Sequence, residues 1–366
     1  MIEAPQRRPA RWGERLDGWG FTSGIRRRLL GLLVALAIVM AGMLVHPAYV
    51  IFRPGPVYDT LGSIDGKPVI EVKGTETYDA SGDLYFTTVA VFGGPEHEIT
   101  AWDYLWAKVQ PGSDIRPMEE VYPSGVTRQQ IQEQTSIQMT SAQDEAKAVA
   151  MRATGRTVPV TITIAGLVPG GPADGVLQKG DEIVSLAGKP VTNVVELRQT
   201  ISAVPDGGKL AMVVKRAGAE VPVQVGTTVT DGRRVVGVGL KVDFRYPVDV
   251  TIHAGSIGGP SAGLMFSLGL YDKLTPGPLT GGAKIAGTGT IADDGSVGPI
   301  GGIDHKMAGA RAGDHADWFL APKDNCTDVR GHIPDGLHVV RVGSFDEAKK
   351  AIESIAAGQG AGLPGC

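Results

Sequence analysis

A serine lies where an apolar strand gives way to a glycine-rich loop and a second apolar segment. Residues 248–254 alternate between apolar and polar side chains, which predicts a strand. The loop 255–263 holds Ser261, and residues 264–270 predict an apolar helix. Free N–H groups at a helix N-terminus stabilise a developing negative charge, so the position suits a nucleophilic serine. For a serine taken alone, a helix N-cap is the simpler interpretation.

A lysine further along the chain offers the base that such a serine needs. Lys306 follows the run Gly298-Pro-Ile-Gly-Gly and enters a predicted helix that continues to Ala312. A serine hydroxyl is a weak nucleophile until a neighbouring group takes its proton. A lysine takes it only when neutral, so burial must lower its pKa from about 10.4 by several units. The apolar neighbours expected to bury it are Ile303, Met307 and Ala308.

Three motifs, in order, resemble the proteolytic domain of Lon peptidases over residues 248–323. They are the Gly259-Pro-Ser-Ala-Gly serine segment, the Thr288-Gly strand end and the Pro-Ile-Gly-Gly lysine segment. The resemblance implies that Ser261 is the nucleophile, Lys306 the general base and Thr288 a supporting hydroxyl. The loop residues predicted to face a developing oxyanion are Gly259, Pro260 and Ser261. The family pattern has acidic residues where this chain has Gly258 and Thr290.

Residues 157–230 resemble a PDZ domain of the bacterial type. The likeness rests on Gly170-Gly-Pro-Ala and on a Leu-x-x-Gly-Asp run that begins at Leu177. PDZ domains bind an extended peptide against a strand edge, which implies a peptide groove. No glycine-rich loop that would bind a peptide carboxylate is clear upstream of Val160. The groove candidates, which suit a core equally well, are Val194, Leu197 and Ile201.

An uncharged apolar run, Leu29–Val45, predicts a membrane helix when its flanks are counted, since about 20 residues are needed. The prediction is a span over 29–52, stopped by the prolines that follow Arg53. The arginines cluster before it, which places the N-terminus in the cytoplasm and the catalytic domain outside. The alternative is a cleaved signal peptide, but its cleavage site is not evident after Met43. The interfacial anchors predicted are Trp12, Trp19, Phe21, Tyr49 and Phe52.

Composition excludes several classes of function. A net charge of −4 argues against nucleic acid as a partner, and the seven histidines show no metal spacing, so neither a metal nor a cofactor is predicted. No phosphate-binding G-x-x-x-x-G-K-[ST] run occurs in the sequence, so we expect ATP-independent action. Cys326 and Cys366 either pair in an oxidising compartment or stay as thiols.

The sequence thus resembles the membrane-anchored PDZ-Lon peptidases of bacteria, and the expected fold class is α+β. The resemblance implies a serine endopeptidase acting on polypeptides, and Lon-type domains commonly form hexamers. One alternative is a non-catalytic PDZ scaffold; another is a hydrolase triad of Ser261 with Asp317 and His338.

The expected segments are a basic cytoplasmic segment (1–28), a transmembrane helix (29–52), a β-rich segment (53–125), a helical connector (126–156), the PDZ domain (157–230), the Lon-type α/β domain (231–357) and a tail (358–366).

Overall fold

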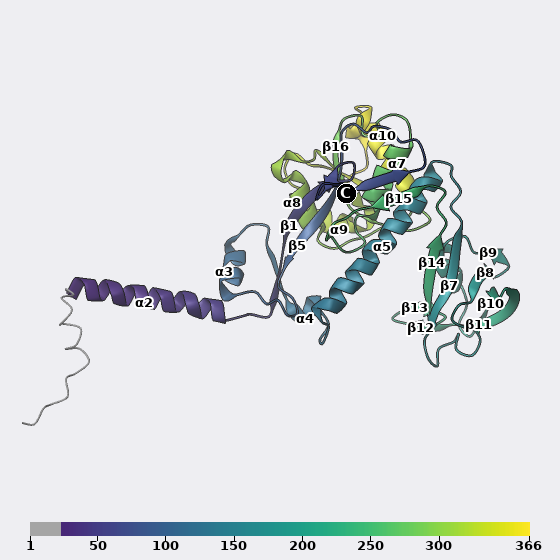
Figure 1. The fold of residues 1–366 in the computed structure, drawn as a ribbon, viewed down its shortest axis with the longest axis horizontal. Helices are drawn as coiled ribbons and strands as arrows, with labels where there is room; N and C mark the ends of the chain where they lie inside the picture. Colours follow the sequence, from purple (N-terminus) through teal and green to yellow (C-terminus); the bar gives the residue numbers. More distant parts are fainter. Residues whose placement is uncertain (1–22) are drawn as a thin grey trace, which may run out of the picture. The chain divides into compact units, whose positions relative to one another are not determined.

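The computed structural model describes residues 23–366, and Figure 1 shows its ribbon. Most of the predicted cytoplasmic segment, with the anchors Trp12, Trp19 and Phe21, lies outside the described residues. The described chain forms two units. One comprises the residues up to Ile51 with Val91–Val126, and the other comprises Phe52–Ala90 with Thr127–Cys366.

The first unit begins with the apolar helix α2, Ser23–Leu44. Its length and composition fit a membrane span or a signal sequence. The predicted end at residue 52 is wrong, because strand β1, Tyr49–Asp59, has already begun there. Pro47 lies just beyond the helix end, and proline disfavours helical backbone at the residue before it. The helix therefore stops before the prolines that follow Arg53.

Three short elements complete this unit. Helix α3 spans Ala101–Val109, and a capping box joins Thr100 to Asp103 at its start. Tyr49, predicted as a membrane anchor, packs at a tilt against Tyr104 with 5.0 Å between ring centroids. The other two elements are β6 (Asp114–Pro117), which pairs with β1, and α4 (Met118–Val121).

A mixed sheet forms the centre of the second unit. Its strand order is β20-β19-β16-β5-β1, and β16 pairs in parallel with both β5 and β19. Strands β1 and β5 precede the PDZ segment in the sequence, so the sheet takes strands from both sides of the predicted boundary at residue 231. The bounds beyond β1 are β5 (Asp83–Phe92), β16 (Lys284–Gly287), β19 (Trp318–Pro322) and β20 (His338–Val342).

Helices and short hairpins surround this sheet. The connector predicted between residues 126 and 156 is the single helix α5, Arg128–Ala153, and a capping box of Thr127 with Gln130 forms its start. Helix α5 packs on the apolar helix α7. The remaining elements are β2 (Ser63–Ile64), β3 (Lys67–Pro68), β4 (Ile70–Lys73), β15 (Asp249–Ile252), α7 (Gly263–Leu274), β17 (Thr290–Ile291), β18 (Val297–Gly298), α8 (Ile303–Arg311), α9 (Cys326–Val329) and α10 (Phe345–Ala356).

The PDZ segment has its own sheet and core. The strand order is β11-β10-β8-β7-β14, so the sheet runs past the predicted end at residue 230. Strand β14 pairs along its length with β7. The elements are β7 (Val160–Leu167), β8 (Glu182–Leu186), β9 (Lys189–Pro190), α6 (Val194–Ser202), β10 (Lys209–Arg216), β11 (Ala219–Gly226), β12 (Thr228–Thr230), β13 (Arg233–Val235) and β14 (Val238–Phe244).

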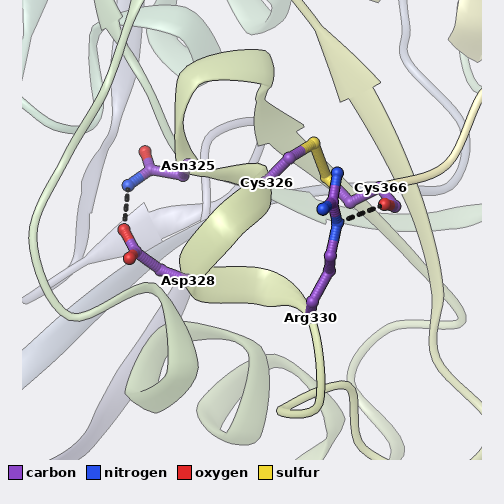
Figure 2. The surroundings of a disulfide bond; sticks show 5 residues. All are labelled: Asn325, Cys326, Asp328, Arg330 and Cys366. Carbon is purple, nitrogen blue, oxygen red and sulfur yellow. Dashed lines mark hydrogen bonds between the residues drawn. A yellow bond between two sulfur atoms is a disulfide. The ribbon is translucent and has the colours of Figure 1, made fainter.

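The two cysteines form a disulfide, which decides between the alternatives that the sequence left open (Figure 2). It ties the chain end at Cys366 to Cys326, the first residue of α9. Arg330 adds a hydrogen bond from Nε to the Cys366 carbonyl, 3.0 Å long. The predicted tail is therefore packed, because the Arg341 N–H also donates to the Pro364 carbonyl.

We expect the double variant Cys326→Ser/Cys366→Ser to unfold more easily. The disulfide closes a loop with a sequence separation of 40, which corresponds to about 2–4 kcal/mol of unfolding free energy. Urea unfolding followed by hydrogen exchange in β19 and β20 measures the loss. Arg330→Ala is the matched control, since it removes only a hydrogen bond worth about 1 kcal/mol. Equal unfolding free energies with and without reductant would contradict the expectation.

Candidate active site

The hydroxyl of Ser261 and the amine of Lys306 lie within hydrogen-bond distance. Lys306 Nζ is 2.8 Å from Ser261 Oγ and 2.9 Å from Thr288 Oγ1. The Thr288 hydroxyl donates its proton to the Ser261 carbonyl at 3.0 Å, so its lone pairs remain free to face the amine. The three residues that the Lon resemblance singled out therefore converge at one point. Ser261 is not a helix N-cap, because α7 begins two residues later with Ala262 in that position.

The lysine is buried without a carboxylate in its hydrogen-bond set. Its side chain is 3% exposed and its two partners are hydroxyls. Burial lowers the pKa of Lys306 to about 7, because the ammonium loses its hydration. A lysine with this pKa is substantially neutral near pH 7 and can accept a proton from serine.

The apolar surroundings of the dyad come mostly from elements distant in the sequence. A cleft of about 400 Å³ reaches both Ser261 and Lys306. Its size lies in the range typical of ligand sites. Of the neighbours predicted to bury the lysine, Ile303 and Met307 lie on α8 with it and are buried core residues. The apolar residues that border the cleft are Tyr58, Phe86, Val89, Met139 and Ile257.

Backbone geometry starts the lysine helix at the required place. Gly302 caps α8 with φ +65°, a left-handed conformation that glycine adopts without strain. The loop before it is fixed by Asn325, whose side chain bonds both the N–H and the carbonyl of Ile300 at 2.9 Å. Asn325 directly precedes the disulfide cysteine Cys326, which Figure 2 shows beside it. The C-terminal region thus supports the loop from which Lys306 projects.

The alternative triad is not assembled. The ring of His338 packs on Trp318, with 4.8 Å between centroids. Asp317 is mostly exposed and lies 3.5 Å from Arg311. The neighbour of Ser261 Oγ is Lys306, so the position that a triad histidine would take is filled by the amine.

Comparison with known proteins agrees with this geometry. The family model described as the Lon protease (S16) C-terminal proteolytic domain matches residues 203–353, and the PDZ domain model matches residues 140–215. The chain carries a Lon-type proteolytic domain and a PDZ domain. The Lon model begins inside the PDZ sheet, whose last strand ends at Phe244.

Curated relatives of the Lon-type domain come from several bacteria. A Lon protease of Rickettsia felis is 29% identical over 185 residues, which are 48% of this chain and 23% of that protein. A Lon protease of Vibrio parahaemolyticus is 36% identical over 121 residues (31% and 15%), and Lon protease 1 of Bacillus subtilis is 34% identical over 118 residues (30% and 15%). The chain thus spans less than a quarter of the length of these relatives.

Helix α5 explains one departure from the Lon pattern. The N–H of Gly259 donates to the Thr135 carbonyl at 2.9 Å, so α5 holds the nucleophile loop directly. A Cβ at Gly258 would lie 2.9 Å from both Cβ and Oγ1 of Thr135, closer than real Cβ contacts. The side of Gly258 that would carry a side chain therefore faces the helix, and the acidic residue of the Lon pattern has no room there.

The same contact narrows the oxyanion prediction. Of the three predicted loop residues, Gly259 already donates its N–H to Thr135, and Pro260 has no N–H. Within residues 23–366, no protein acceptor takes the N–H of Ser261. Of the three loop residues, Ser261 is therefore the one whose N–H can donate to an oxyanion. It lies next to the N-terminus of α7.

The PDZ domain has an edge strand that the sequence did not indicate. The candidates Leu197 and Ile201 are core residues, and Val194 lies at the edge of that core. The missed element is β14, which begins at Val238 and is the last strand of the sheet. In the described chain β14 pairs on one side only, with β7. An edge strand with a free side is what a bound peptide extends.

The contact between α5 and the nucleophile loop gives a testable prediction. Gly258→Ala should push the loop away from Thr135 and reduce kcat on the order of 10²-fold, because small displacements of a nucleophile are costly. Thr135→Gly in the same chain removes the two nearest atoms and should restore much of the rate.

Peptide cleavage by the single and double variants measures this rescue. Thr140→Gly is the matched control, since Thr140 has the same side-chain bond to its own helix as Thr135 and should not rescue Gly258→Ala. Equal rescue by both glycine substitutions would show that helix flexibility, not the local clash, is responsible.

Proposed function

We propose that this chain is an ATP-independent, membrane-anchored serine endopeptidase that cleaves polypeptides outside the cytoplasm. The observation that carries the proposal is the 2.8 Å contact between Ser261 Oγ and the buried amine of Lys306. A lysine with no carboxylate partner and a lowered pKa has the properties of a general base. Peptide hydrolysis at such a dyad needs only the serine, the amine and water.

The reaction follows from the positions of these atoms. Neutral Lys306 takes the proton of Ser261 Oγ as the oxygen attacks the carbonyl carbon of the substrate. The Ser261 N–H and the N-terminus of α7 stabilise the oxyanion of the tetrahedral intermediate. The ammonium of Lys306 then protonates the leaving amine, and an acyl-enzyme remains on Ser261. Water, deprotonated by the same amine, releases the second product. Thr288 orients the amine and anchors the serine main chain.

The PDZ domain is proposed to select or position polypeptides through β14. A peptide that pairs with the free edge of β14 gains main-chain hydrogen bonds and lies next to the half-buried side chains of Leu240 and Val242. The second candidate function is a PDZ scaffold without catalysis. Covalent labelling of the purified protein with a serine-reactive probe separates the two. Labelling at Ser261 supports the peptidase, and no labelling supports the scaffold.

Substitution of the lysine tests the catalytic assignment. Lys306→Ala should lower the rate of peptide cleavage on the order of 10²–10⁴-fold, because Ser261 then lacks a proton acceptor. Lys306→Arg should be nearly as damaging, since the guanidinium stays protonated. His338→Ala is the matched control and should retain activity. Activity retained in Lys306→Ala and lost in His338→Ala would restore the triad.

The pH dependence of the same reaction provides an independent test. Below its pKa Lys306 is an ammonium and cannot accept a proton, and above it the amine is neutral. Activity should therefore rise with pH, with a midpoint near the lowered pKa of about 7. A midpoint close to the ordinary lysine value of about 10.4 would argue against the buried base. The measurement is kcat/KM for a peptide without titratable groups.

The orientation of the anchor predicts where the catalytic domain lies. Seven arginines precede the apolar core of α2, namely Arg7, Arg8, Arg11, Arg15, Arg26, Arg27 and Arg28. They favour a cytoplasmic N-terminus. A reporter fused after Cys366 should therefore be digested by protease added to intact cells without an outer barrier. A reporter that is digested only after lysis would contradict this orientation.

A further inference from the structure

Helix α3 presents an apolar stripe that the protein leaves uncovered. Trp102, Leu105, Trp106 and Val109 occur at spacings of three and four residues, so they share one face of the helix. Their exposed fractions are 39%, 52%, 62% and 72%. The opposite face is packed, since Ala107 is buried with Ile51 and Ile99 and the ring of Tyr104 packs against that of Tyr49. The exposed stripe is therefore not the core face of the helix.

The position of α3 along α2 indicates what covers the stripe. The indole Nε1 of Trp102 donates to the Val39 carbonyl of α2 at 3.0 Å, and the Ala101 N–H donates to the Val45 carbonyl at 2.8 Å. The Trp102 ring lies against Gly42, where an added Cβ would overlap it. Helix α3 is thus fixed to the C-terminal turns of α2, within the same unit of the chain.

The depth of this attachment matches a membrane interface. Val39 precedes the end of α2 at Leu44 by five residues, about 7.5 Å along the helix axis. Amphipathic helices in an interface bury their apolar face by about 5–10 Å. Tryptophan is enriched at this level because its ring is apolar and its N–H is polar. The charged side chains Asp103 and Lys108 lie off the stripe.

We infer that α3 is an interfacial helix that inserts Trp102, Leu105, Trp106 and Val109 into the lipid on the side where α2 ends. This inference rests on α2 spanning the bilayer, but it does not depend on peptidase activity. The large apolar side chains of α2 are exposed in the described chain, and the surface they form continues into the stripe of α3 through the contact of Trp102 with Gly42. A lipid bilayer covers both surfaces at once. Helix α3 would then fix the end of α2 at the membrane surface.

Quenching of tryptophan fluorescence by brominated lipids tests the inference on the full chain in vesicles. In a Trp12→Phe/Trp19→Phe/Trp318→Phe variant the remaining tryptophans are those of α3. Bromines near the headgroup end of the acyl chains should quench most of this fluorescence, and bromines at mid-chain should quench it less. The matched control retains Trp318 and replaces Trp12, Trp19, Trp102 and Trp106 by phenylalanine, and it should not be quenched.

Two outcomes would overturn the inference and are distinguishable. A chain that fails to float with the vesicles would show that α2 is not an anchor, and the role of α3 would fall with it. A chain that floats but shows no more quenching than the Trp318 control would leave the anchor intact and refute the insertion of α3. Peptide cleavage measured on the same samples reports the dyad separately.

Discussion

Burial of one amine is the condition on which the rest of the site depends. Lys306 acts on Ser261 only if it is neutral, and it is neutral only where water and carboxylates are kept away from it. Its two hydrogen-bond partners are hydroxyls, which satisfy the amine without stabilising the ammonium as a carboxylate would. A lysine moved to the surface at the same distance from the serine would remain charged and would not serve as a base.

Three segments distant in the sequence must meet to create this environment. The nucleophile loop follows β15, Thr288 follows β16, and the lysine lies on α8, 45 residues beyond the serine. Main-chain bonds join the first two, since the Gly289 N–H donates to the Ser261 carbonyl at 2.8 Å. The parallel pairing of β16 with β5 and β19 fixes the end of the strand that Thr288 follows, and the dyad depends on that rigidity.

Helix α5, which directly precedes the PDZ segment in the sequence, forms part of the site. Helix α5 accepts the N–H of Gly259 and supplies Met139 to the cleft, although its sequence carries no catalytic signature. Its approach to Gly258 takes the space of a side chain that the Lon pattern keeps at this position. The glycine at this position of the loop is thus linked to a helix more than a hundred residues earlier in the sequence.

The sequence by itself predicted the Ser261, Thr288 and Lys306 set, and it indicated the PDZ and Lon-type domains and the connector helix α5. These features depend on residue types at short spacings, which a sequence displays directly. Only the tertiary structure decided that β1 and β5 join the sheet, that β14 completes the PDZ sheet, that α5 holds the nucleophile loop and that Cys326 pairs with Cys366. Each of these contacts joins segments far apart in the chain. Strand pairing, helix docking and disulfide formation depend on three-dimensional distance, for which spacing along the sequence carries no signal.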